Sequence, residues 1–146
     1  MSALDQATLD ALVAAARAVQ PRAYAPYSRF HVGAAILTRS GRMHLGVNVE
    51  NASYPVGCCA ERNAIGAAHT AGDSDAIAVA VTTDAPLPVM PCGMCSQALF
   101  ELSPELVVTA EGRDGARREV RIKDVLPFAY QGEGLEVRPT RAPETP

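Results

Sequence analysis

The segment "AIAVAVTT", residues 76–83, constrains the fold of this chain more than any other feature. It is a continuous apolar run with β-branched residues, and it lacks the polar alternation of a strand that has one face in water. Such a run predicts a β-strand that is covered on both faces. We therefore expect a sheet with other elements packed against each of its sides.

The segments around this strand alternate between helical and extended patterns. Apolar side chains recur at helical spacing in residues 4–19, and Pro21 ends that pattern. Further helices are expected at 59–71 and 93–102, and strands at 31–38, 43–49 and 106–110, with a short strand and one helical turn closing the fold before Tyr130. This order predicts a three-layer α/β domain, in which a site lies where strands lead into helix starts.

The length of 146 residues predicts one domain, residues 1–135, that buries a sufficient core without cysteine staples. Residues 136–146 are polar and rich in proline, so we expect a flexible C-terminal tail there. Hydrophobic residues make up 48% of the chain and charged residues 20%, which is typical of a soluble globular protein.

Charge and composition exclude several classes of function. The net charge of −3 argues against a nucleic acid partner, because that affinity comes from Lys and Arg on phosphates. The apolar N-terminal segment contains Asp10 and lacks a basic leader, which argues against a secretory signal and a membrane span. We therefore expect a cytoplasmic protein, in which cysteine pairs bind metals or act in redox chemistry more often than they form disulfides.

All four cysteines lie in two short motifs, "CCAERNA" at 58–64 and "PCGMC" at 91–95. Both motifs fall at predicted helix starts, where unpaired N–H groups stabilise a thiolate, the form that binds metals. A redox pair at Cys92 and Cys95 would leave the first motif unexplained, and inert buried cysteines would not account for the placement at helix starts. Zinc, which takes three or four such ligands, accounts for both motifs.

The spacing leaves two kinds of zinc site open. A closed site with all four cysteines would be structural, although the adjacent Cys58 and Cys59 point apart. A site with three ligands keeps a position for water, as catalytic zinc sites do, and Glu61 would then be the general acid and base. Alternatively, Glu61 only stabilises the helix dipole from the first turn. Spacing does not decide which of Cys58 and Cys59 binds the metal.

Five stretches of the chain resemble one family: "YAPYSRFHVGAAI", "GVNVENASY", "CCAERNAIGAA", "PCGMC" and "DVLPFAY". They are similar to the small, homotetrameric, zinc-dependent cytidine deaminases of pyrimidine salvage, and the likeness runs from Tyr24 to Tyr130. The resemblance implies a three-layer α/β/α sandwich with a central mixed β-sheet. It also implies one Zn²⁺ per subunit, a homotetramer whose active sites are completed by neighbouring subunits, and deamination of cytidine and deoxycytidine to uridine and deoxyuridine with release of ammonia.

The same resemblance implies roles for individual residues in catalysis. The implied zinc ligands are Cys59, Cys92 and Cys95, with Cys58 outside the site. Glu61 would take a proton from zinc-bound water and return protons to the ring N3 and the departing amine. Arg62 resembles a family arginine that hydrogen-bonds to the cysteine sulfurs.

The resemblance also implies contacts with the nucleoside, made by Phe30 on the pyrimidine ring, by Asn48 and Glu50 on the ribose hydroxyls, and by Tyr54, Ala60 and Tyr130. A carboxylate and an amide two residues apart on one strand face the same side and suit a vicinal diol. Without the family, a solvated Asn–Glu pair at a strand end would be an ordinary alternative, and Phe30 would be a core residue.

The chain departs from the family pattern at two positions. Ser96 stands where relatives commonly have an arginine, and a hydroxyl adds no positive charge beside three thiolates. We therefore expect Arg62 and the two helix starts to carry more of the charge compensation. Tyr130 stands where many relatives have a phenylalanine that reaches into a neighbouring subunit. The histidines lack acidic or cysteine neighbours at ligand spacing and are expected to be structural or solvent-facing: His31, His44 and His69.

Three other functions compete with this interpretation. Blasticidin-S-type deaminases share the "CAE" and "PCGxC" motifs, but they are not expected to keep "NVEN", so Asn48 and Glu50 favour a ribonucleoside. A polynucleotide deaminase is disfavoured by the acidic charge of the chain. A zinc-stabilised scaffold without catalysis would keep the cysteines and have no use for Glu61.

Overall fold

The computed structural model describes residues 4–132. Within them, five strands form one sheet in the order β2-β1-β3-β4-β5. Their bounds are β1 (Val32–Thr38), β2 (Met43–Val47), β3 (Ala76–Thr83), β4 (Val107–Glu111) and β5 (Arg117–Arg121). Strands β3 and β4 run parallel and the other three neighbouring pairs run antiparallel, so the sheet is mixed, as expected. The expected tail at 136–146 lies outside the described residues.

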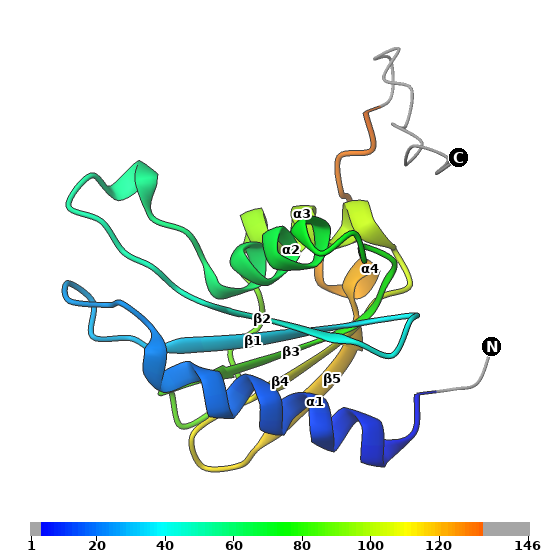
Figure 1. Cartoon of the computed structure of the whole chain (residues 1–146), viewed down its shortest axis with the longest axis horizontal. Helices are drawn as coiled ribbons and strands as arrows, with labels where there is room; N and C mark the ends of the chain where they lie inside the picture. The colour runs from blue at the N-terminus through cyan, green and yellow to red at the C-terminus, as the bar shows by residue number, and fades with distance from the viewer. Residues whose placement is uncertain (1–3, 133–146) are drawn as a thin grey trace.

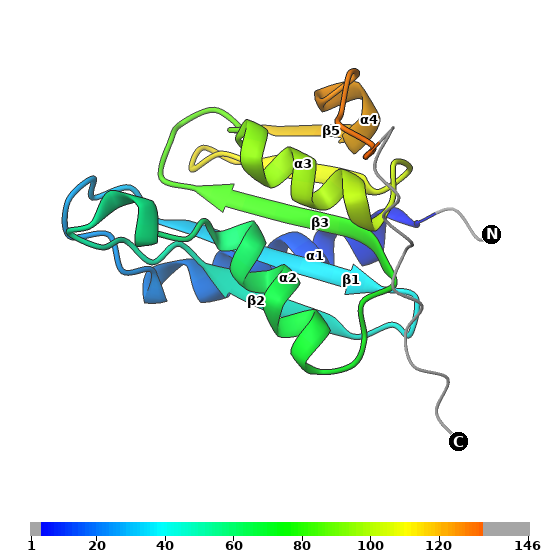
Figure 2. The same cartoon turned by 90° about the horizontal axis from the view of Figure 1, so that it is seen from above.

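Helices cover both faces of the sheet (Figures 1 and 2). One face carries α1 (Gln6–Val19), and the other carries α2 (Ala60–Thr70), α3 (Gly93–Leu102) and the short α4 (Ile122–Val125). Two 3-10 turns, η1 (Gln20–Arg22) and η2 (Tyr54–Val56), lie in the connections. The three-layer α/β/α architecture is therefore confirmed. In the described part of the chain, no helix has the length and hydropathy that a bilayer crossing requires.

The apolar run at 76–83 is β3 itself, and helices cover both of its faces. Val79 and Val81 belong to the core beneath α2 and α3. Ala78 and Ala80 belong to a second core against α1, because successive side chains of a strand point to opposite faces. The two cores explain why this strand needs no polar face.

The second predicted strand is shorter than expected, since β2 ends at Val47 rather than at residue 49. Beyond it the chain leaves the sheet and pairs with two loops: Val49 forms isolated bridges with Tyr24 and with Cys58. The backbone N–H of Tyr24 donates to the carbonyl of Asn48 at 3.0 Å, and the N–H of Glu50 donates to the carbonyl of Tyr24 at 2.8 Å. These long-range pairings bring the segment 48–50 beside the first cysteine motif.

Helix α2 lies unusually close to β2 at Gly46. A Cβ atom built on Gly46 would lie 2.2 Å from the carbonyl oxygen of Ala60 and 2.4 Å from the nitrogen of Ala64. Any side chain at this position would therefore push the first turn of α2 away from the sheet. The glycine allows the helix that begins beside Cys59 to sit directly on β2.

Candidate metal centre and active site

Three cysteine sulfurs meet where α2 and α3 begin. Cys59 is the N-cap of α2, Cys92 is the N-cap of α3, and Cys95 lies buried in the first turn of α3. Their Sγ atoms all lie within 4.8 Å of one another. Zn–S bonds of about 2.3 Å in a tetrahedron place sulfurs about 3.8 Å apart, so the cluster needs only a small contraction around an ion. A donor set of three sulfurs at this spacing fits Zn²⁺.

Cys58 is outside this cluster. Its backbone N–H and carbonyl both hydrogen-bond to Val49, at 2.9 Å each. Along extended backbone, neighbouring side chains point to opposite sides, so the backbone that directs Cys59 toward α3 directs Cys58 away. All four cysteines are free thiols, and Cys92 is exposed, which does not fit a set of inert buried side chains. Within residues 4–132, the cysteine cluster thus has three members.

Positive charge surrounds these sulfurs. The unpaired N–H groups at the starts of α2 and α3 lie beside them, since two of the cysteines are N-caps. The Nη2 of Arg62 lies 4.0 Å from the Sγ of Cys59 and donates to the carbonyl of Gly57 at 3.4 Å. A hydrogen bond from the Cys95 thiol, together with those from Arg62 and Cys92, lowers the pKa of Cys59 to about 5, although burial opposes this. The thiolate that a metal requires is therefore favoured at Cys59.

Glu61 lies in the first turn of α2, and only 5% of it is exposed. Burial raises the pKa of Glu61, and the negative charge of the nearby Cys59 raises it further. A carboxyl group in this environment gains and loses a proton closer to neutral pH than an exposed glutamate does. These surroundings favour an acid–base role over that of a solvated first-turn carboxylate.

A cavity of about 260 Å³ adjoins the sulfurs. Its lining includes seven of the residues expected to form the site: Phe30, Asn48, Glu50, Cys59, Ala60, Glu61 and Cys92. These residues come from two loop segments and two helix starts and converge on one hollow. The volume is on the scale of a site for a single small molecule.

Asn48 fixes the backbone of the segment that contains Phe30, which forms one wall of the cavity. Its Oδ1 accepts a hydrogen bond from the backbone N–H of Val32, and its Nδ2 donates to the carbonyl of Phe30, both at 2.8 Å. Arg29, just before this segment, has a φ of 58°, a left-handed conformation that non-glycine residues seldom adopt. An amide group has two donors and two lone pairs, so within residues 4–132 Asn48 keeps one of each for a ligand.

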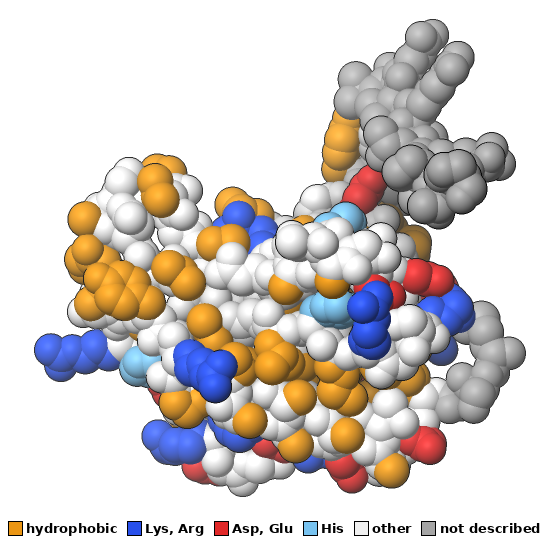
Figure 3. All heavy atoms as spheres, in the orientation of Figure 1, with side chains coloured by type: hydrophobic (Ala, Val, Ile, Leu, Met, Phe, Trp, Pro, Cys, Tyr) orange, Lys and Arg blue, Asp and Glu red, His pale blue; other side chains and the backbone are white. Residues whose placement is uncertain are grey.

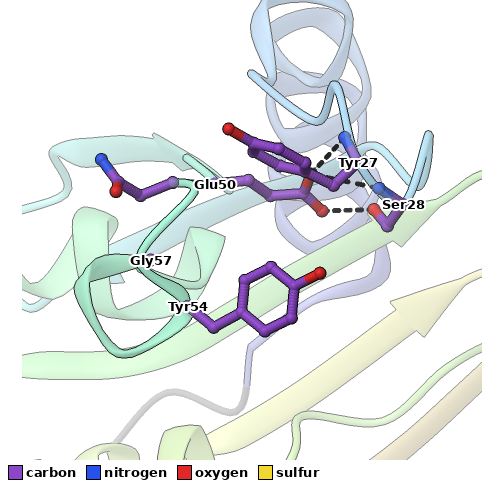
Figure 4. A pocket seen from close by; sticks show the side chains of 6 residues that line it. Tyr27, Ser28, Glu50, Tyr54 and Gly57 are labelled. Atoms are coloured by element: carbon purple, nitrogen blue, oxygen red, sulfur yellow. Dashed lines mark hydrogen bonds between the residues drawn. The ribbon is translucent and has the colours of Figure 1, made fainter.

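Glu50 is held by the loop that precedes Phe30 (Figure 4). Its carboxylate accepts hydrogen bonds from the backbone N–H groups of Tyr27, at 3.0 Å, and Ser28, at 3.2 Å, and from the Ser28 hydroxyl. The hydroxyl of Ser28, followed by these backbone groups, keeps the pKa of Glu50 below its usual value. Glu50 is therefore presented as a fixed, ionised acceptor.

Two expected substrate contacts do not line this cavity within one chain. Tyr54 is 80% exposed and lines a neighbouring hollow of about 400 Å³, which shares Ser28 and Glu50 with the metal-side cavity. Its ring packs edge-on against Tyr27, with ring centroids 6.3 Å apart (Figure 4). Tyr130 lies beyond α4, where its backbone N–H and carbonyl both hydrogen-bond to the side chain of Gln97, at 3.0 and 2.8 Å.

The remaining expectations concern Ser96 and the histidines. Ser96 is buried, and its hydroxyl donates to the carbonyl of Pro91 at 3.1 Å, so it braces the turn that carries Cys92. His44 lies 2.8 Å from Asp73 and His31 lies 2.8 Å from Asp84, both within hydrogen-bonding distance. These pairs join segments distant in sequence, and spacing along the chain did not indicate them.

Several lining residues were not expected from the sequence: Ser28, Val32, Val81, Thr83, Val89 and Met90. Strand alternation would have placed Val81 and Thr83 on one face, and a helix start beside the end of β3 would have suggested which face. Ser28 carried no such signal, because the bridge between Tyr24 and Val49 positions its loop.

Comparison with known proteins agrees with this geometry. Residues 6–111 match the model of the cytidine and deoxycytidylate deaminase zinc-binding region. A cytidine deaminase of Halalkalibacterium halodurans is 43% identical over 121 residues, which cover 81% of this chain and 92% of the relative. The crystal structure of a cytidine deaminase from Burkholderia pseudomallei is 44% identical with a TM-score of 0.80, covering 83% of this chain and 98% of that one.

A cytidine deaminase from Mycobacterium tuberculosis also has a similar structure, with a TM-score of 0.75 at 38% identity, covering 84% of this chain and 97% of that one. The matched region contains the three-cysteine cluster, Glu61 and β1 to β4. This chain therefore belongs to the cytidine and deoxycytidylate deaminase family with a zinc-binding region.

Proposed function

We propose that this chain is a zinc-dependent cytidine deaminase that hydrolyses cytidine and deoxycytidine to uridine and deoxyuridine with release of ammonia. The observation that carries the proposal is the cavity in which the buried Glu61 lies beside the sulfur cluster, with Asn48 and Glu50 on its wall. The names of relatives at 43% and 44% identity support the same substrate. Pyrimidine salvage in the cytoplasm is the corresponding role.

Cys59, Cys92 and Cys95 would hold the zinc ion, one per subunit. When bound, Zn²⁺ supplies a Lewis acid that brings the pKa of a water molecule toward neutrality. Arg62 and the two helix starts offset the negative charge of the thiolates. Ser96 is neutral and adds no positive charge there.

Glu61 moves the protons of the reaction. It accepts one proton from the water that attacks C4 of the base and delivers it to the ring N3; it then takes the second proton from the resulting C4 hydroxyl and delivers it to the departing amine. Its burial supports this role, because burial raises the pKa of the carboxyl group and so favours its taking up a proton during the reaction.

Asn48 and Glu50 orient the substrate through its sugar. Glu50 is an ionised acceptor, and Asn48 has one free donor and one free lone pair, a combination that suits a vicinal diol. Phe30 and the backbone of Ala60 contact the base, and the apolar lining of Val32, Val81 and Met90 excludes water. This wall favours a nucleoside over blasticidin S.

We further propose a homotetramer in which neighbouring subunits complete each active site. Large aromatic side chains are exposed in the loop before β1, in η2 and in the segment after α4: Tyr24, Tyr27, Tyr54, Phe128 and Tyr130. Figure 3 shows apolar atoms gathered at the end of the molecule that carries η2. Phe128 is 96% exposed, which is costly for a monomer in water. Sedimentation equilibrium tests the assembly, and a monomer at micromolar concentration would contradict it.

The substitution Glu61→Gln tests the catalytic proposal. It should abolish ammonia release from cytidine while the bound zinc, measured by atomic emission, stays at the wild-type level. Glu101→Gln, on the exposed side of α3, is the matched control and should keep full turnover. Chelation should remove activity, and added zinc should restore it.

Substrate comparison separates the remaining alternatives. Cytidine and deoxycytidine should be deaminated faster than blasticidin S or cytosines in single-stranded DNA. A zinc-loaded wild type that leaves cytidine unchanged would refute the proposal and would favour a scaffold.

A further inference from the structure

Thr83, the last residue of β3, is a buried polar residue on the wall of the metal-side cavity. It is 1% exposed and lines the cavity together with Phe30, Val32 and Glu61. Its hydroxyl has no hydrogen-bond partner among residues 4–132. A buried hydroxyl without a partner destabilises a fold, so a hydroxyl on a binding-site wall is explained best by a partner that arrives with the ligand.

Strand register places Thr83 in line with the sugar-binding residues. Thr83 pairs with Val32 across β1, and Val32 in turn exchanges hydrogen bonds with Asn48. Neighbouring strands are separated by about 4.8 Å, so Thr83 lies about 9–10 Å from Asn48 across two strand intervals. A nucleoside that is held by its ribose at Asn48 and lies along this row would bring its base to Thr83.

The side of the sheet on which Thr83 lies agrees with this placement. Thr83 is two residues from Val81, which belongs to the core beneath α2 and α3, so both side chains project toward the face where Cys59 and Glu61 lie. The preceding Thr82 projects to the α1 face beside Ala80 and does not line the cavity. Its hydroxyl is also buried and has no partner within the described residues.

We propose that the hydroxyl of Thr83 hydrogen-bonds to the polar edge of the bound pyrimidine base and so contributes to the selection of the substrate. This proposal rests on the proposed function, because only a nucleoside has a sugar to bind at Asn48 and a pyrimidine base to reach Thr83. It adds a substrate contact from β3 to those made by the helix starts. The Thr83 contact contributes to selectivity for the base, whereas Asn48 and Glu50 contribute to selectivity for the sugar.

The pair Thr83→Val and Thr82→Val tests the proposal, since each removes one buried, unpartnered hydroxyl and keeps the volume of the side chain. Thr83→Val should lower kcat/KM for cytidine about tenfold, the effect of one lost hydrogen bond. Thr82→Val should leave kcat/KM within about twofold of the wild type. Thr83→Ser, which restores the hydroxyl, should recover most of the loss. Bound zinc should match the wild type in all three variants.

Four results would overturn the proposal. Thr83→Val with unchanged kcat/KM would mean that water or a relaxed backbone satisfies the hydroxyl. An equal loss in Thr82→Val, or no recovery in Thr83→Ser, would mean that the strand and not the contact was disturbed. A wild type inactive on cytidine but fully loaded with zinc refutes the proposed function itself, and the Thr83 contact with it, which separates the two failures.

Discussion

Replacing Gly46 with alanine should disturb the metal centre, because Gly46 lies on β2 directly against the first turn of α2. The new Cβ would lie 2.2 Å from the carbonyl oxygen of Ala60, whereas ordinary van der Waals contact begins at 3.4 Å. The first turn of α2 must therefore move away from the sheet by about 1 Å, carrying Cys59 and Glu61 with it. Overpacking of this kind lowers the free energy of unfolding by about 1–3 kcal/mol.

The loss of activity should exceed the loss of stability. A displacement of about 1 Å of positioned groups costs roughly 100-fold in rate, so we expect kcat/KM for cytidine to fall by about that factor. Bound zinc should also decrease, because the Sγ of Cys59 would move relative to the two sulfurs of α3. Urea denaturation, atomic emission and ammonia release measure the three quantities on one preparation.

Gly66 provides a matched control in the same helix. Among the described residues, a Cβ on Gly66 meets nothing within 4 Å, and the residue is exposed. Gly66→Ala should therefore raise the free energy of unfolding by about 0.5–1 kcal/mol and leave turnover unchanged. If Gly46→Ala lowers stability but retains wild-type zinc and turnover, the edge strand β2 has moved instead of the helix. That result would refute the claim that this glycine positions the site.

Three further predictions concern the sulfurs and the far end of the sheet. Cys58→Ser should keep wild-type zinc content, whereas Cys59→Ser should lose the metal; equal loss in both would contradict the three-sulfur cluster. Arg62→Ala should weaken zinc affinity about tenfold in a competition assay with a chelator, and Ser96→Ala should not, since that hydroxyl is engaged by a backbone carbonyl. Hydrogen bonds from His44, followed by those from neighbouring hydroxyls, hold the pKa of Asp73 in the folded protein below 3.8. The ionised Asp73 therefore stabilises the fold fully above pH 3.8, and this stabilisation is lost as the pH falls through the pKa of the folded state. Asp73→Asn should therefore lower the thermal midpoint at pH 7 by several degrees, and the difference from wild type should shrink in acid; a difference independent of pH would contradict it.

Local elements were largely predictable from the sequence. The strand at 76–83 and the helix at 93–102 have the predicted bounds, and the helix at 59–71 ends where Gly72 adopts a positive φ of 66°. Periodicity and turn residues determine such elements through near neighbours, without reference to the rest of the chain. The concentration of cysteines at helix starts was likewise predictable from the order of residues alone, because both motifs are short.

Contacts between distant segments were not predictable in this way. Spacing could not predict whether Cys58 or Cys59 belongs to the metal cluster, because the backbone bridge between Cys58 and Val49 determines which side chain faces it. The end of β2 at Val47 and the separate hollow beside Tyr54 depend on the same pairing of segments far apart in sequence.

The sequence by itself therefore determined the elements and the two cysteine motifs of this protein, since each depends on residues close together in the chain, and the order of the elements determined the three-layer class. The tertiary structure decided which sulfurs meet, that Glu61 is buried beside them, and that Thr83 stands in one row with Asn48. The physical reason is that burial and cross-strand register arise only when segments separated by dozens of residues pack together.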